Sequence, residues 1–152
     1  LTLDRTLPIQ AIDRSGWAVE ETRHTHSAFG LTGRAQRGEL PMALPKAHAG
    51  DMLCFGWVLS ELPRSDRDRM LARLESALRR RTALMILEPL STRISPWWPD
   101  WEDRLSQRGA RSELIRVAIE RPLWIQDMDK AARLDHQVIG ARVIAAPGPE
   151  QQ

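Results

Sequence analysis

Two acidic residues follow short strand-like segments, where a carboxylate could bind a ligand. Asp13 ends the run LPIQAID, and Glu39 lies in RGEL at the end of a second short segment. In many α/β sheets, a carboxylate at the C-terminal end of a strand accepts hydrogen bonds from the hydroxyls of a nucleotide ribose. The alternative for Asp13 is structural, because an acid after a strand also forms a turn or caps the next helix. For Glu39 the alternative is simple exposure to solvent.

Other residue types that could do chemistry are sparse. Glu61, in the loop before Pro63, could abstract a proton from a substrate, although a carboxylate in such a loop usually faces solvent. Cys54 is the only cysteine and lies in an apolar run, so we predict a buried, inert thiol and no intrachain disulfide. His24 and His26 are two residues apart and point to different sides of a helix, so we predict no metal site.

Half of the six tryptophans lie within five residues of one another, at positions 97, 98 and 101. Trp97, Trp98 and Trp101 could stack against a base or an aromatic substrate. Alternatively, the three rings form a small satellite core that holds this segment against a sheet.

Strand-like and helical segments alternate along the chain, and this order must position the candidate residues. Ser15 is a predicted helix N-cap, and Pro63 and Ser65 open the clearest helix. The segment 113–121 is ambiguous between strand and helix. Strands are predicted over 7–12, 33–40, 52–59, 83–87 and 136–146, and helices over 15–30, 63–81, after Pro99, and over 123–135. The alternation predicts an α/β fold with a mostly parallel sheet and flanking helices.

Length and charge limit the functional classes. A chain of 152 residues fits one domain, which we place at 1–146, with a disordered tail at 147–152. The formal net charge is +2 and the only basic run is Arg79–Arg81, so no strong nucleic-acid footprint is evident. No apolar run approaches the roughly 20 residues of a membrane helix. With one cysteine and no signal peptide, the sequence favours a cytoplasmic protein without a membrane partner.

The amino-acid sequences of four segments resemble those of the class I S-adenosylmethionine-dependent methyltransferases, a Rossmann-like family. AIDRSGWAVEETRHTHSAFGLTGRAQRGEL resembles their second and third strand units, and GDMLCFGWVLSELP their fourth strand and its turn. TALMILEP resembles the fifth strand, and AARLDHQVIGARVIA the late helix and strand. Within the family, the chain is most similar to small bacterial proteins related to the mitochondrial ribosome-associated Rsm22 group.

The resemblance implies roles for individual residues. Asp13 would bind the ribose of S-adenosylmethionine, with Arg14, Ser15 and Trp17 lining the same rim. Glu39 and Leu40 would approach the adenine. Phe55, Gly56 and Trp57 would lie at the end of the fourth strand, where the methyl group is presented. The catalytic residue is not identified, with Glu61 as the weak candidate.

One feature of the family is missing from the sequence. Its members carry a glycine-rich loop after their first strand, and residues 1–12 contain no glycine. We therefore expect a domain truncated before its first strand. The alternatives are a relative that no longer binds cofactor, or a partner chain that supplies the missing part. Unpaired strand edges would then favour a homodimer.

The sequence thus predicts a methyltransferase, or a large fragment of one, with an unidentified methyl acceptor. Catalysis in such folds is largely positioning, because the sulfonium cofactor is already activated. The alternative is a non-catalytic binding or assembly module on the same scaffold, associated with RNA or the ribosome.

Overall fold

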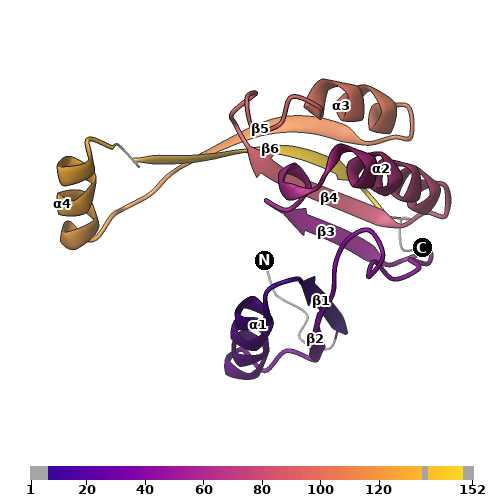
Figure 1. Ribbon diagram of the computed structural model, residues 1–152, viewed down its shortest axis with the longest axis horizontal. Coiled ribbons are helices and arrows are strands. Elements are labelled where there is room, and N and C mark those ends of the chain that lie inside the picture. Colours follow the sequence, from indigo (N-terminus) through magenta and orange to yellow (C-terminus); the bar gives the residue numbers. More distant parts are fainter. Residues whose placement is uncertain (1–6, 135–136, 149–152) are drawn as a thin grey trace. The chain divides into compact units, whose positions relative to one another are not determined.

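The computed structural model describes residues 7–134 and 137–148 and divides the chain into two compact units (Figure 1). Unit 1 is Leu1–Lys46, and unit 2 is Ala47–Gln152. Strands and helices alternate through both, as the sequence predicts. No helix among the described residues combines the length and apolar character needed to cross a membrane.

Unit 1 is built on one βαβ element. It contains β1 (Ile9–Asp13), α1 (Gly16–Ala28) and β2 (Gly33–Arg37), and the two strands pair in parallel from Ile9↔Gly33 to Asp13↔Arg37. The predicted N-cap is confirmed, because the Ser15 hydroxyl accepts a hydrogen bond from the Ala18 N–H at 3.4 Å. The helix is followed by Gly30 in the left-handed conformation, where glycine has no steric penalty.

The interior of unit 1 is small and is supported by polar contacts. Val19 of α1 and Ala35 of β2 are buried, together with His26. Arg23 reaches from α1 to β2, where its Nε and Nη2 donate to the Ala35 carbonyl at 3.2 and 2.8 Å. Gly33 passes so close to the His26 ring that a Cβ at this position would lie 2.6 Å from Nδ1. The helix and strand are therefore held by a few close contacts.

Unit 2 contains a four-stranded sheet with strand order β3-β4-β6-β5. β3 and β4 pair in parallel, and β6 runs antiparallel to both β4 and β5, so three of the four strands share one direction. The elements are β3 (Met52–Gly56), a 3-10 helix (Leu59–Glu61), α2 (Arg64–Arg79), β4 (Ala83–Pro89), α3 (Trp98–Ser106), β5 (Arg111–Ala118), α4 (Leu123–Ala132) and β6 (Val138–Ala146).

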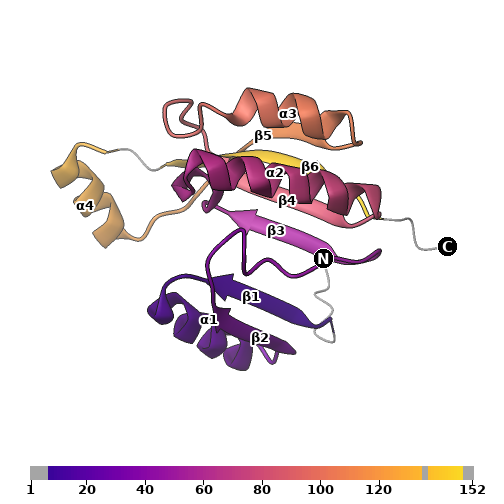
Figure 2. The ribbon, with the colours of Figure 1, turned by 45° about the vertical axis from the view of Figure 1, so that its right-hand side comes forward.

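The core of unit 2 lies between the sheet and helices α2 and α3, which cover the same face of the sheet (Figures 1 and 2). β4 alternates between half-buried and fully buried positions, as expected for a sheet whose two faces differ. The fully buried side chains of this layer are Leu59, Met70, Leu71, Leu74, Ile86, Trp98, Trp101, Leu105 and Ile144. This core is much larger than that of unit 1.

Two expectations need correction, and one open alternative is resolved. The predicted strand 52–59 ends at Gly56, because Trp57 takes a left-handed conformation and Leu59 starts a 3-10 helix. The ambiguous segment 113–121 belongs to the strand β5 as far as Ala118. Cys54 is exposed, because the helices cover the face to which its neighbour Phe55 points. Although the residue as a whole is exposed, partial burial of the thiol raises the pKa of Cys54, which keeps it protonated and poorly nucleophilic.

Candidate functional site

In unit 1, Asp13 stands exposed at the carboxyl end of β1 and fixes the turn into α1. Its Oδ1 accepts a hydrogen bond from the Ser15 N–H at 2.7 Å, and its backbone carbonyl accepts one from the Gly38 N–H at 3.0 Å. The side chain therefore has the structural role that the sequence offered as the alternative. A carboxylate has about four acceptor positions, so this single hydrogen bond leaves capacity for a ligand.

The parallel register brings the second predicted acid to the same edge of the unit 1 sheet. Asp13 is in register with Arg37, the last residue of β2, and Glu39 follows two residues later. The Arg37 Nε donates to the Arg14 carbonyl at 2.9 Å and ties the two strand ends together. Glu39 is exposed and Leu40 is half-buried. Asp13, Arg14, Ser15, Glu39 and Leu40 thus belong to the loops at one edge.

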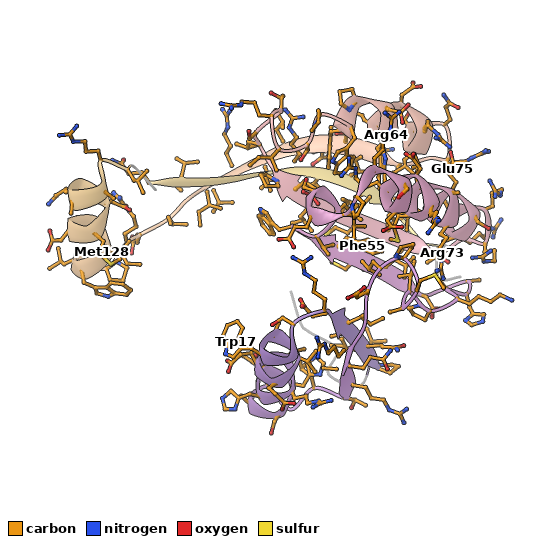
Figure 3. All side chains as sticks on the ribbon, in the orientation of Figure 1. Trp17, Phe55, Arg64, Arg73, Glu75 and Met128 are labelled. Carbon is orange, nitrogen blue, oxygen red and sulfur yellow. The ribbon has the colours of Figure 1, made fainter. Side chains whose placement is uncertain are left out.

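In unit 2, the three predicted residues at the end of β3 have different environments. Phe55 is buried, with 5% of its surface exposed, so its ring belongs to the core (Figure 3). Gly56 is exposed, and a Cβ there would have no neighbour within 4 Å. Trp57 has a φ of 54°, is 50% exposed, and donates its N–H to the Leu87 carbonyl at 2.9 Å. Only Gly56 and Trp57 offer side-chain space or surface to a ligand.

A buried carboxylate that the sequence analysis did not single out supports the loop after β3. Glu88, at the end of β4, is fully buried. Its Oε1 accepts from the Leu59 N–H at 2.9 Å and the Ser60 N–H at 3.3 Å, and its Oε2 accepts from the Ser60 hydroxyl at 2.6 Å. The Ser60 and Ser95 hydroxyls lie 2.8 Å apart. The acid in ALMILEP was the available signal, because an acid that ends an apolar strand needs partners when buried.

Glu61, the weak catalytic candidate, is exposed at the end of the 3-10 helix. Its neighbours on the chain are the residues that Glu88 holds. Its catalytic role stays a prediction.

The three tryptophans pack against one another at the start of α3. The Trp97 ring lies 5.8 Å from that of Trp98 and 4.7 Å from that of Trp101, and the Arg67 guanidinium lies 5.9 Å from the Trp97 ring centre. Trp98 and Trp101 are 2% and 1% exposed, which makes them core side chains and leaves them no surface for a base. Trp97 is half-buried and remains the one of the three with surface to offer.

Two further features bear on ligand binding. An open depression of about 690 Å³ lies between α3 and the start of β5 and includes none of the predicted site residues; it is lined by Pro99, Glu102, Asp103, Ser106, Ala110, Arg111, Ser112 and Glu113. Among the described residues, no three histidine, cysteine, aspartate or glutamate side chains gather in a way that could hold a metal ion.

Comparison with known proteins finds likeness at the level of structure. Neither a protein-family model nor a curated protein matches the chain. A precorrin 8w decarboxylase from Methanobacterium thermoautotrophicum matches with a TM-score of 0.55 and 16% identity, over 93% of this chain and 69% of that one. A precorrin-6y C5,15-methyltransferase from Geobacter metallireducens GS-15 matches with a TM-score of 0.52 and 15% identity, over 93% and 67%. The YcgJ protein of Bacillus subtilis matches with 0.51 and 12%, over 93% and 90%.

These likenesses establish the fold. The chain has the mixed α/β, Rossmann-like architecture of structures that include methyltransferases, which confirms the predicted fold class. At identities of 16% and below, they do not by themselves assign an activity.

Proposed function

We propose that the chain is the cofactor-binding part, or most, of an S-adenosylmethionine-dependent methyltransferase. The observation that carries the proposal is in unit 1, where parallel pairing puts Asp13 and Glu39 at the carboxyl ends of adjacent strands. Ligands of open α/β sheets bind at that edge. The methyltransferases among the structural neighbours add support at the level of fold.

The residues of unit 1 fit the adenosine part of such a cofactor. Asp13 is exposed and already oriented by the Ser15 N–H, so its remaining acceptor positions suit a vicinal diol. The exposed Glu39 carboxylate suits an exocyclic amine, and the half-buried Leu40 suits the face of a base. Arg14 and Ser15 complete the rim, and Trp17 projects from α1 with 74% of its surface exposed (Figure 3).

For unit 2, the sequence resemblance alone suggests a role in presenting the methyl group at the end of β3. Gly56 is the last residue of that strand and Trp57 follows it, while the buried Phe55 supports both from the core. When bound, the cofactor supplies a methyl group on a positively charged sulfur. The chain itself has to orient the acceptor and exclude water. The loop that the Glu88 hydrogen bonds hold suits this positioning role. The identity of the methyl acceptor is not part of the proposal.

The test is the affinity for S-adenosylhomocysteine, measured by titration calorimetry on the wild type and on Asp13→Asn and Asp13→Ala. Asn keeps an oxygen for the Ser15 N–H and removes the charge, whereas Ala removes both. We expect each variant to lose about 1 to 3 kcal/mol of binding free energy, the range for a charged hydrogen-bond partner.

Asp51 provides a matched control. It too is exposed, and its Oδ2 accepts a hydrogen bond from a backbone N–H, that of His48, at 2.7 Å. Asp51→Asn should leave the affinity unchanged. Equal affinities of wild type and Asp13→Asn would remove Asp13 from the ribose site. If the wild type does not bind the nucleoside at all, the methyltransferase proposal fails.

The finer assignment to the Rsm22-related group, with a ribosomal or RNA partner, is supported only by the sequence resemblance. RNA binding measured at several salt concentrations tests this assignment, because phosphate contacts make the affinity fall steeply as salt is added. RNA binding of this kind, together with absent nucleoside binding, would favour the assembly module over the enzyme.

A further inference from the structure

Strands β5 and β6 extend beyond the rest of unit 2 and carry α4 between them (Figures 1 and 2). We define the arm as residues 114–139, which comprise most of β5, α4 and the start of β6. The strands stay paired through it, from Leu114↔Arg142 to Ala118↔Val138. Within the helix-bearing part, Arg121 pairs with the buried Asp129, which fixes α4 on the segment before it. The described residues of the arm, 114–134 and 137–139, thus have little core of their own.

Apolar side chains are concentrated on the surface of the arm. Every residue of β5 is exposed. On α4, the exposed Trp124 and Met128 are four residues apart and so lie on one helix face; Figure 3 labels Met128. Trp124 is 64% exposed and Leu123 is 77% exposed. The exposed large apolar side chains of the arm are Leu114, Ile115, Val117, Leu123, Trp124, Met128, Leu134, Val138 and Ile139.

The exposed area is on the scale of a protein interface. An aromatic side chain buries about 150 to 250 Å² and an aliphatic one less. At exposures of 41 to 77%, the nine side chains together expose on the order of several hundred Å², divided between the two faces of the strand pair and α4. A standard interface buries about 800 Å² on each partner. The arm therefore exposes apolar surface on the scale that one partner contributes to a complex.

The charges of the arm and of its base are balanced, which argues against a strongly charged partner. Four acids and four bases lie between residues 113 and 134, and two of the pairs are made within α4 or with its preceding segment. These charged residues are Glu113, Arg116, Glu120, Arg121, Asp127, Asp129, Lys130 and Arg133. Such a surface has no net field to attract RNA or a membrane of one charge.

β5 is the last strand of its sheet, so its outer edge can accept another strand. A two-fold axis normal to the sheet at Arg116 would place β5 antiparallel to its own copy. Because successive side chains of a strand point to opposite faces, Ile115 of one copy would then lie opposite Val117 of the other copy. Self-association through one patch is the commonest form of protein oligomer. From the neutral charge, the apolar area and the free edge, we infer that the arm is a dimerisation surface whose occupant is the arm of a second copy of this chain.

The test is sedimentation velocity of the full chain from about 1 to 100 μM, the range in which a micromolar complex dissociates. The wild type is expected to form a concentration-dependent dimer. The double variant Ile115→Lys/Val117→Lys should raise the dimer dissociation constant at least about 100-fold, because like charges would face one another across the axis. Circular dichroism checks that the fold is retained.

Trp17→Glu is the control, because Trp17 is a large apolar side chain, 74% exposed, that belongs to unit 1. It should leave the dimer unchanged. Amide exchange gives a second readout on the unmodified protein, since the β5 amides should exchange more slowly as concentration rises. A wild type that is monomeric throughout, a dimer that survives the arm substitutions, or equal weakening by Trp17→Glu would each overturn the inference.

Discussion

The two units differ in how they are held together. Unit 2 has a layered core of large apolar side chains between its sheet and two helices. Unit 1 has two strands and one helix, and a two-stranded sheet alone is marginal in water. There the close packing of Gly33 on His26 and the Arg23 bonds to the Ala35 carbonyl stand in place of a large core. The unit with the smaller core carries the better-defined ligand edge.

Trp101→Ala tests the core of unit 2 and should have the largest effect. The ring is 1% exposed and packs edge-on against Trp97. Its removal leaves a cavity, and we expect the free energy of unfolding to fall by about 3 to 5 kcal/mol. Urea denaturation monitored by far-ultraviolet circular dichroism measures it. Trp17→Ala, at a position 74% exposed, is the matched control and should stay within about 0.5 kcal/mol of wild type.

Gly33→Ala tests unit 1, where a small change meets a tight contact. The added methyl would collide with the His26 ring, and we expect a loss of about 1 to 3 kcal/mol. Hydrogen exchange of the α1 amides reports on this unit. Gly16→Ala adds the same methyl into open space in α1 and should not destabilise.

The double variant Gly33→Ala/His26→Ala identifies the cause of that loss. If the collision causes it, the two substitutions should be non-additive by at least about 0.5 kcal/mol in the favourable direction. If the losses of the two single variants add strictly, unit 1 accommodates the methyl group by another movement. Its packing would then be looser than that of unit 2.

The titration of Cys54 tests the face of the unit 2 sheet that the helices do not cover. It should show the smallest effect of these predictions. Partial burial raises the pKa of its thiol above the ordinary value of 9.0, so alkylation of the native protein should reach half-maximal rate above pH 9.0. The same midpoint in urea should lie near 9.0. Because the folded state holds the proton more tightly, the unfolding free energy should fall as the pH rises above 9.0. Identical native and denatured midpoints would contradict the stated burial.

The alternation of apolar runs predicted most of the fold. The runs that end in Asp13 and Pro89 are both strands, and Ser15 caps the first helix. Strand ends were less well predicted, because the apolar run through Leu59 hides the left-handed turn at Trp57. The segment around Leu114 lacked a clear period because β5 is exposed on all its residues and has no buried face to impose one.

The candidate site was predictable only where it lies within one stretch of chain. Asp13 and Ser15 are neighbours in sequence, and their hydrogen bond follows from local turn chemistry. Glu88 was missed because its partners, Leu59 and Ser60, are distant in sequence and are brought close by the parallel pairing of β3 and β4. The burial of Phe55 was equally hidden, since alternation does not say which face the helices cover.

The buried Glu88 carboxylate has a consequence for transplanting parts of this scaffold. It satisfies two backbone amides of the loop after β3 and reaches Ser95 through the Ser60 hydroxyl. An exchange of residues 57–61 with another protein would therefore succeed only if the acid at the end of β4 and the two serines moved with it. The three segments, although separated in sequence, depend on one another. Substitutions in any one of them are therefore constrained by the other two.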